Sequence, residues 1–305
     1  MKHYFYCAGL ILFAIIFAAG IPFILNLTDN LTDIQKIPQN NSQIAGVQKY
    51  NIPPVSNNLP VPLFSAKALL IKDLETGAFL FKKNSDVSLP IASTTKIITA
   101  LVGSEYFNSN SILTVSKSAS VPGSTAGLTA GENLSFRAML YGMLLNSGND
   151  AAYAIAENYP QGTGGFIAAM NQKVSNLQLK NTKFDNPAGF DSPNHFSSAE
   201  DLAVLTEEAL KNNVLARIFA TKETSIVSLD KKNKHQLVNL NKLLSNVWGV
   251  LGVKTGTTEE AKENLVTLVE REGHRVLIVL LGSNDRFGET TNLIEWTYAN
   301  FEWPQ

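Results

Sequence analysis

The chain lacks the residues on which several kinds of functional site depend. Its 305 residues include a single cysteine, Cys7, so no disulfide can form within one chain. The four histidines are scattered, with no His-x-x-x-His spacing that would suit a metal ion. We therefore expect neither a metal nor another cofactor. The chain also has no excess of one charge, since its formal net charge is −1. Its overall electrostatic field would therefore not attract nucleic acid.

Charged residues are absent from residues 4–25, and this apolar run matches the ~20 residues that cross a hydrocarbon core. Lys2 precedes the run and Asp29 follows it, which favours a cytoplasmic N-terminus. Small residues near position 20 could instead form the cleavage site of a signal peptide. Because the apolar run continues past that site, we expect 1–26 to be a single-pass membrane anchor. A cleaved signal, which would release a secreted protein, is the alternative, and both place the remainder outside the cytoplasm.

Apolar residues are few and aperiodic over 27–63, where Asn, Gln, Pro and Ser are frequent. Such a segment cannot bury enough surface to offset the entropy lost on ordering it. We expect it to be a flexible linker, followed by a single domain over 64–305.

The hydrophobic pattern of this domain changes from strands to helices and back. Two apolar runs, 66–71 and 78–81, flank a turn and predict a strand hairpin. Helical spacing follows in five segments: 93–106, 135–145, a third beginning near 150, 166–177 and 199–210. Strand patterns return at 250–255, 264–269 and 275–281, before a final helix over 289–301. This order predicts an α+β fold with an all-helical subregion and a mostly antiparallel sheet, covered by helices, that contains both the first and the last strands.

A serine and a lysine lie one turn apart where the first helix begins. In the motif Ser93-x-x-Lys96 both side chains lie on one helix face. A serine hydroxyl is a weak nucleophile that needs a base, and a lysine amine can act as one if burial and positive charge lower its pKa. Alone, the motif is better explained by a capping serine and a solvated lysine.

A second motif, Ser147-Gly148-Asn149, falls between two predicted helices. The glycine breaks the helical run and allows the turn to approach a cleft closely. Its serine could relay a proton toward a leaving amine, and its asparagine could hold a peptide carbonyl. By itself this motif indicates only a loop.

The third motif, Lys254-Thr255-Gly256-Thr257, ends a predicted strand. Lys254 offers a fixed positive charge, Thr255 offers a hydroxyl for a carboxylate, and Gly256 would let an extended substrate lie against the strand edge. The backbone N–H groups of Thr257 and Ser93 could together form an oxyanion hole.

The order of the three motifs is more informative than any one of them. Ser-x-x-Lys opening a helix, Ser-x-Asn between helices and Lys-Thr-Gly on a late strand form the set found in β-lactamases and penicillin-binding proteins. Each motif lies in the structural context that this chemistry requires.

Longer stretches extend the likeness beyond the motifs. Residues 84–102, 144–157, 166–201 and 282–296 are similar to the nucleophile region, second motif, helical stretch and C-terminal segment of one family. Over about 66–303 the chain resembles the D-alanyl-D-alanine carboxypeptidase family of low-molecular-mass penicillin-binding proteins. The resemblance implies a serine hydrolase of β-lactamase/transpeptidase-like fold that acts on peptidoglycan stem peptides ending in D-Ala-D-Ala. It also implies acylation by β-lactam antibiotics.

The resemblance assigns roles to individual residues. It implies that Ser93 forms the acyl-enzyme, that Lys96 activates it and that Ser147 transfers protons. It further implies contacts from Asn149, Lys254, Thr255 and Arg286 to the substrate, with the Arg286 guanidinium near the terminal carboxylate.

Two positions depart from the family pattern. An arginine common between two asparagines is replaced by Leu240, and a glycine common after the third motif is replaced by Lys262. Both departures leave the shape of the cleft rim and the substrate preference open. The usual C-terminal β-domain and amphipathic anchor are not matched, and we expect the N-terminal segment to take the place of that anchor.

Two other functions share the motifs. A serine β-lactamase would need a base for deacylation, and neither Glu157, in a predicted helix, nor the segment 185–187 supplies an obvious one. A non-catalytic penicillin-binding sensor of the cell wall is the other alternative, which the intact Ser93, Lys96, Ser147 and Lys254 argue against. The balance between carboxypeptidase, endopeptidase and transpeptidase activity stays open.

Overall fold

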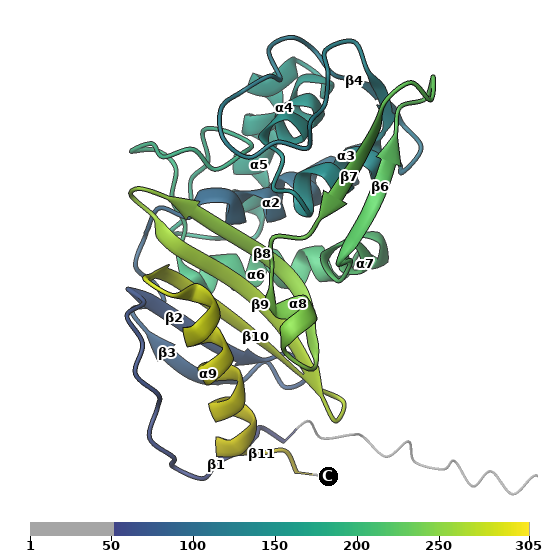
Figure 1. Cartoon of the computed structure of the whole chain (residues 1–305). Coiled ribbons are helices and arrows are strands. Elements are labelled where there is room, and N and C mark those ends of the chain that lie inside the picture. Colours follow the sequence, from purple (N-terminus) through teal and green to yellow (C-terminus); the bar gives the residue numbers. More distant parts are fainter. Residues whose placement is uncertain (1–51, 305) are drawn as a thin grey trace, which may run out of the picture. The chain divides into compact units, whose positions relative to one another are not determined.

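A five-stranded antiparallel sheet forms the centre of the fold in the computed structural model, which describes residues 52–304 (Figure 1). In spatial order its strands are β3 (Phe79–Lys83), β2 (Ala68–Asp73), β10 (His274–Ser283), β9 (Lys262–Arg271) and β8 (Val250–Thr258). The first two strands of the sheet thus pair with the last three, as the sequence predicts. Because β8 is the outermost strand, one of its edges is open to another partner.

Both faces of the sheet are covered. Along β10, Leu277, Val279 and Leu281 pack into the core beneath the helical region, while Ile278 and Leu280 pack into a second core on the opposite face. This alternation follows from the period of two in a strand. Because both faces are buried, β10 is continuously apolar over 276–281, and β9 is apolar over 265–269 apart from Thr267.

The helices divide between the two faces (Figure 1). The helical region comprises η1 (a 3-10 turn, Ala92–Thr95), α2 (Lys96–Tyr106), α3 (Phe136–Leu144), α4 (Asn149–Glu157), α5 (Gly162–Asn176), α6 (Ala199–Leu210) and α7 (Asn213–Phe219). Within it, α6 lies against α2 on one side and against β2 and β10 on the other. Helix α9 (Arg286–Asn300) covers the other face, and the short α8 (Leu243–Asn246) leads into β8. The predicted α+β architecture is confirmed.

Several elements differ from the predictions. Helix α5 begins at Gly162, and the fold also contains α7, the hairpin β4 (Ile112–Thr114)–β5 (Asn133–Ser135) and the hairpin β6 (Glu223–Val227)–β7 (Lys234–Val238). The strands of both hairpins bury one residue each, such as Ile226 in β6 and Leu237 in β7. A single buried position is too few to produce a recognisable alternation.

The predicted linker over 27–63 ends earlier than expected. Strand β1 (Val55–Ser56) pairs with β11 (Phe301–Glu302), and the backbone N–H of Leu59 donates to Asn300 Oδ1 at 2.7 Å. Packed structure therefore begins near residue 55 rather than at 64, because this segment finds partners in the last turn of α9 and in β11. The rest of the linker and the predicted anchor over 1–26 lie outside the described residues. Within residues 52–304 no helix has the length and apolar character needed to span a bilayer.

Candidate active site

The nucleophile turn, residues 91–95, precedes α2. Ala92 has φ of +47°, a conformation that costs an alanine strain energy and that recurs at functional sites. Two hydroxyls hold the turn: Thr94 Oγ1 donates to Ile91 O at 2.7 Å, and Thr95 Oγ1 donates to Ala92 O at 2.8 Å. Ser93 thereby faces Lys96, whose Nζ lies 2.9 Å from Ser93 Oγ.

Lys96 is completely buried, and its amine contacts three oxygens. Besides Ser93 Oγ these are Asn149 Oδ1 at 2.8 Å and Ala188 O at 2.7 Å. A neutral amine has two hydrogens and one lone pair. It can donate to the two carbonyl oxygens and still accept the hydroxyl hydrogen of Ser93.

Burial lowers the pKa of Lys96 well below its usual value, and the positive charge of Lys254 lowers it further, while Asp150 acts in the opposite direction. An amine that loses its proton this easily can serve as a base for a serine hydroxyl. The cluster formed by Ser93, Lys96 and Asn149 therefore has the chemistry of an activated nucleophile.

The second motif connects α3 to α4. Ser147 has φ of +57°, and its Oγ accepts a hydrogen bond from Lys254 Nζ at 3.0 Å. A Cβ on Gly148 would lie 2.9 Å from both Gly142 O and Ala126 N, so only glycine fits at this position. Asn149 begins α4, which aims its side chain at Lys96.

The third motif lies on β8. Lys254 is buried, and burial together with the nearby Arg286 lowers its pKa to about 7. Its charge is thus conditional on pH rather than fixed. A Cβ on Gly256 would approach Ile91 O and Ser93 N to 3.0 and 3.1 Å. The glycine therefore lets β8 pack closely against the nucleophile turn, in addition to any room that it leaves for a substrate.

Arg286 reaches the same strand from the first turn of α9. Its Nη1 donates to Gly256 O at 3.1 Å and also contacts the Thr257 hydroxyl. Glu263 lies 3.9 Å away, and the guanidinium is mostly buried. Arg286 adds positive charge where β8 ends, beside Thr257.

The structure thus brings together the residues that the sequence selected. Ser93, Lys96 and Asn149 form one group, Ser147 and Lys254 form a second, and Gly256 joins β8 to the turn that holds the nucleophile. Thr255 lies buried between them on β8. Their catalytic and binding roles stay predictions.

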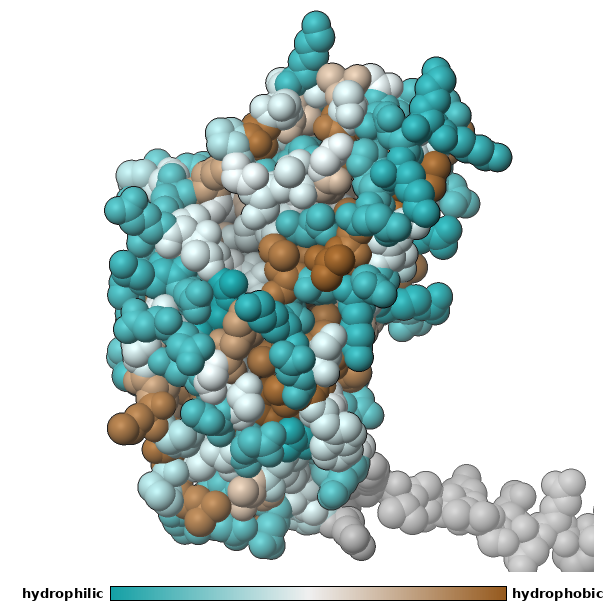
Figure 2. Space-filling view, viewed as in Figure 1, coloured by the Kyte–Doolittle hydropathy of each residue, from teal (hydrophilic) through white to brown (hydrophobic). Residues whose placement is uncertain are grey.

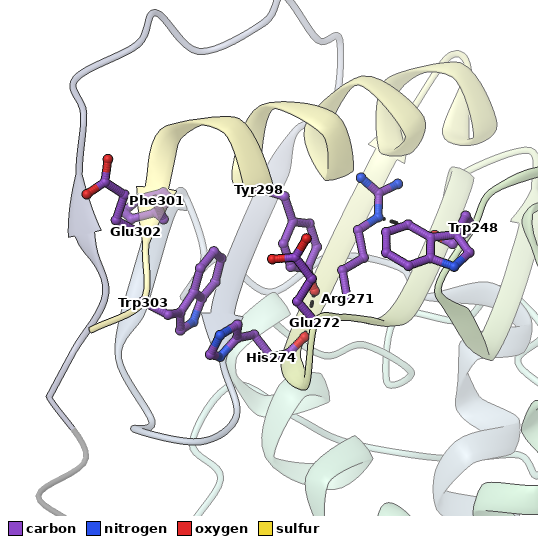
Figure 3. Close-up of a pocket in the computed structure, with 8 residues that line it drawn as sticks. All are labelled: Trp248, Arg271, Glu272, His274, Tyr298, Phe301, Glu302 and Trp303. Carbon is purple, nitrogen blue, oxygen red and sulfur yellow. Dashed lines mark hydrogen bonds between the residues drawn. The ribbon is translucent and has the colours of Figure 1, made fainter. Parts of the chain in front are cut away.

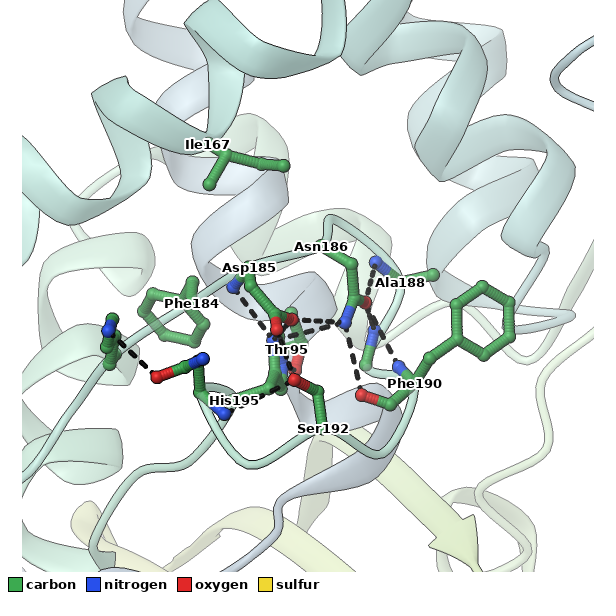
Figure 4. Close-up of polar contacts among 12 residues, drawn as sticks. Thr95, Ile167, Phe184, Asp185, Asn186, Ala188, Phe190, Ser192 and His195 are labelled. Atoms are coloured by element: carbon green, nitrogen blue, oxygen red, sulfur yellow. Dashed lines mark hydrogen bonds and ion pairs between the residues drawn. The ribbon is translucent and has the colours of Figure 1, made fainter.

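Sequence reasoning missed the loop 184–197, whose polar contacts with one another and with Thr95 are drawn in Figure 4. Ala188 supplies the carbonyl that contacts Lys96, and Gly189 packs so closely that a Cβ would lie 1.9 Å from Ala92 O. His195 contacts Thr95 from the same loop. In the sequence, only the resemblance of this stretch to the family pointed to a role for the loop. The loop and the nucleophile turn that it contacts are about a hundred residues apart, so no local pattern connects them.

The two departures from the family pattern have different surroundings. The N–H of Leu240 donates to Leu145 O at 3.1 Å, close in sequence to Ser147. Leu240 and Val238 are exposed, and Figure 2 shows apolar surface where the β6–β7 hairpin approaches the sheet. Lys262 has φ of +56° where β9 begins, a conformation that glycine adopts without strain.

A cavity of about 690 Å³ lies at a different place on the fold (Figure 3). Aromatic and charged side chains from the β9–β10 turn, α9, β11 and the segment before β8 line it, among them Trp248, Arg271, Tyr298 and Trp303. Arg271 is already paired with Glu295 through two hydrogen bonds, and the Trp303 indole donates to Asp73. None of the predicted site residues lines this cavity.

Comparison with known proteins gives consistent matches. The family model described as D-alanyl-D-alanine carboxypeptidase matches residues 56–285. The D-alanyl-D-alanine carboxypeptidase DacF of Bacillus subtilis is 35% identical over 246 residues, covering 78% of this chain. The corresponding Streptomyces sp. (strain K15) protein is 33% identical, with 73% of this chain and 84% of that protein covered. The D-alanyl-D-alanine endopeptidase of Pseudomonas aeruginosa is 31% identical, with 80% and 81% covered.

The match to DacF spans only 63% of the length of that relative. Among solved structures, the Streptomyces K15 DD-transpeptidase superposes with a TM-score of 0.75 at 31% identity, covering 79% of this chain and all of that one.

Proposed function

The chain belongs to the D-alanyl-D-alanine carboxypeptidase family, and from this premise we propose that it is a penicillin-binding serine peptidase. It removes the terminal D-alanine from peptidoglycan stem peptides through an acyl-enzyme on Ser93. The observation that carries the proposal is the contact between Ser93 Oγ and a buried lysine amine of lowered pKa.

Acylation begins with proton transfer from Ser93 Oγ to the lone pair of Lys96. The oxygen attacks the carbonyl carbon of the D-Ala-D-Ala peptide bond, and the N–H groups of Ser93 and Thr257 stabilise the resulting oxyanion. When the C–N bond breaks, Lys96 gives up the proton that it took from Ser93, and the Ser147 hydroxyl passes a proton on to the leaving amine, so that Lys96 is neutral again. Lys254 Nζ holds the Ser147 hydroxyl at 3.0 Å. D-Alanine departs, and an ester on Ser93 remains.

Deacylation reverses the roles. Water attacks the ester carbonyl, gives its proton to Lys96, and Ser93 leaves with a hydrogen restored to Oγ. β-Lactam antibiotics would acylate Ser93 by the same first step, with opening of the lactam ring in place of loss of D-alanine.

Substrate binding uses the open edge of β8. An extended stem peptide can add to this edge as a further strand, with its penultimate carbonyl between Ser93 and Thr257. In this proposal the second amide hydrogen of Asn149, whose first goes to Pro122 O, holds a peptide carbonyl. Lys254, Thr255 and Arg286 donate to the terminal carboxylate.

The location of the substrate fits the N-terminal sequence. The apolar run over 4–25 would anchor the chain in the cell membrane and hold the domain on its outer side, where peptidoglycan lies. If this segment were cleaved as a signal, the domain would be secreted to the same side.

Among the competing functions, a β-lactamase finds little support. Glu157 is engaged with the hydroxyls of Ser116 and Ser118, at 2.5 and 2.7 Å, rather than with Ser93 or Lys96. It is therefore not placed to deacylate a penicilloyl enzyme. Sustained turnover of a chromogenic penicillin, in place of a stoichiometric burst, would favour the β-lactamase.

Mass spectrometry of the full chain in detergent tests the proposal. We expect a penicillin to add one covalent group, and a pentapeptide ending in D-Ala-D-Ala to lose D-alanine. Ser93→Ala should abolish both reactions, and Lys96→Ala should slow acylation by several orders of magnitude. Ser88→Ala, an exposed serine nearby in sequence, is the control. Labelling that persists in Ser93→Ala, or acylation without any peptide turnover, would contradict the peptidase.

A further inference from the structure

His195 is a buried histidine that faces the nucleophile turn from the loop 184–197 (Figure 4). Its Nε2 lies 2.7 Å from Thr95 Oγ1, although the two residues are a hundred positions apart. The ring is 2% exposed and packs edge-on against Phe184. It has no hydrogen bond to Ser93 or Lys96, and Thr95 is the residue of the nucleophile turn to which it is hydrogen-bonded.

The hydrogen-bond directions around Thr95 are determined by counting hydrogens. The threonine hydroxyl has one hydrogen, and it donates to Ala92 O because a carbonyl oxygen can only accept. His195 Nε2 must therefore carry the hydrogen that points at Thr95 Oγ1. The two bonds form a chain in which each hydrogen bond polarises the next.

The opposite nitrogen of the ring, Nδ1, lies between a backbone donor and a carboxylate. The N–H of Asp185 donates to Nδ1 at 3.2 Å, and Asp185 Oδ1 lies 3.2 Å from the same nitrogen. The amide nitrogen of Asn186, 3.3 Å away, directs its two hydrogens to Asp185 Oδ1 and Phe190 O. The orientation of the Asn186 amide is clear, because its oxygen accepts three backbone N–H groups, from residues 188, 189 and 190. Because the backbone N–H of Asp185 points at Nδ1, this nitrogen accepts a hydrogen bond, and the neutral ring carries its hydrogen on Nε2.

The charges around His195 act in both directions. Burial lowers its pKa to about 4, and the charge of Lys96 also lowers it. The carboxylates of Asp185, at 3.2 Å from Nδ1, and of Asp191 raise it. Burial outweighs them, so the neutral ring is the form present near pH 7.

The far end of the chain of hydrogen bonds is the peptide group between Ala92 and Ser93. A peptide group is planar and trans, so its C=O and N–H point in opposite directions. Thr95 holds the Ala92 oxygen, and the direction of the Ser93 N–H is thereby set as well. Because Ala92 has φ of +47°, this peptide needs such support to keep its orientation.

We propose that His195 is a positioning residue, which acts through Thr95 to aim the Ser93 N–H at the oxyanion. The inference rests on the proposed function, since it takes this N–H as an oxyanion donor. The donor matters most when the carbonyl oxygen becomes negative. Loss of the hydrogen bonds from His195 to Thr95 and from Thr95 to Ala92 should therefore slow acylation and leave initial binding largely unchanged.

Three variants and one control separate positioning from general support. His195→Leu and Thr95→Val each remove one of the two hydrogen bonds that link His195 to Ala92. His195→Gln keeps an amide N–H that can replace Nε2–H. Thr99→Val is the matched control. Thr99 is likewise buried, lies in α2 and donates to Pro187 O at 2.7 Å in the same loop, but its hydroxyl has no hydrogen bond to Ala92.

Stopped-flow acylation of the full chain by a penicillin gives the binding constant and the first-order acylation rate separately. Loss of a whole oxyanion donor slows enzymes by about 10²–10³-fold. Misdirection of one donor in His195→Leu or Thr95→Val should therefore slow acylation by about 10- to 100-fold, with His195→Gln close to the wild type. A peptide boronic acid, whose tetrahedral adduct on Ser93 mimics the oxyanion, should lose affinity by the same factor.

Each outcome has one interpretation. Equal losses in Thr99→Val and Thr95→Val, or unchanged acylation and boronate affinity in Thr95→Val, would overturn the positioning role. Where His195→Leu does not fold, Thr95→Val and His195→Gln carry the test. If the wild-type chain itself is not acylated by penicillin, the proposed function fails instead, and this result differs from every outcome for the variants.

Discussion

Gly189→Ala tests whether the loop 184–197 controls the nucleophile. Gly189 has φ of +95°, and a Cβ there would lie 1.9 Å from Ala92 O and 2.9 Å from Ser93 N. Both neighbours are backbone atoms, which cannot rotate away as a side chain could. The substitution must therefore displace either the loop or the peptide that carries the Ser93 N–H.

Two contributions make up the expected cost. The backbone conformation costs an alanine about 1–3 kcal/mol, and the steric overlap adds about 1–3 kcal/mol. For a domain of this size each 1 kcal/mol lowers the unfolding midpoint by about 2–4 °C. Gly131 separates the contributions, because it has φ of +91° and no atom within 4 Å of a Cβ. Gly131→Ala should show only the conformational cost.

Thermal unfolding and penicillin acylation should be measured on both variants. We expect Gly189→Ala to unfold at a lower temperature than Gly131→Ala and, where folded, to acylate at least about 10-fold more slowly, because the oxyanion donor has moved. Gly131→Ala should acylate as the wild type does. Equal stability and equal acylation rates in the two variants would refute the inferred contact between the loop and the nucleophile turn.

Two further predictions concern pH. The positive charge of Lys254 lowers the pKa of Lys96, so Lys254→Gln should raise that pKa. The acylation rate, measured at saturating penicillin over a pH series, should then rise at a higher pH than in the wild type. A rise at the same pH in both proteins would contradict the coupling. The pKa of His195 is about 4 when folded against 6.5 ordinarily, so the unfolded chain binds more protons between these values and stability must fall as pH drops from 6.5 to 4. The difference corresponds to about 3 kcal/mol. Denaturant unfolding should show this loss in the wild type and a smaller loss in His195→Gln, and identical slopes in both would rule out a buried neutral histidine.

Much of the site could be predicted because its parts are local. The spacing of Ser93 and Lys96 places them on one face of a helix without knowledge of the fold. The alternating and continuous apolar runs likewise predict the strands of the main sheet. The order of the motifs then indicated which segments had to meet.

The remainder depended on contacts that no local pattern encodes. The carbonyl of Ala188 reaches Lys96 only because the loop 184–197 folds back onto α2. In the sequence His195 was only one of four scattered histidines, and its place beside Thr95 became visible only with the fold in view. Strand β1 escaped prediction for a similar reason, because its partners are the last residues of the described chain.

The hydrogen-bond partners of Lys96 limit how far its side chain has to move when it gains or loses a proton. Its three oxygen neighbours, at 2.7–2.9 Å, accept three hydrogens from an ammonium as readily as they accommodate an amine that accepts one. Proton arrival and departure therefore require no displacement of heavy atoms, so the reorganisation energy at this residue is small. The free and acylated enzymes should superpose at the Lys96 side chain within the error of a high-resolution structure.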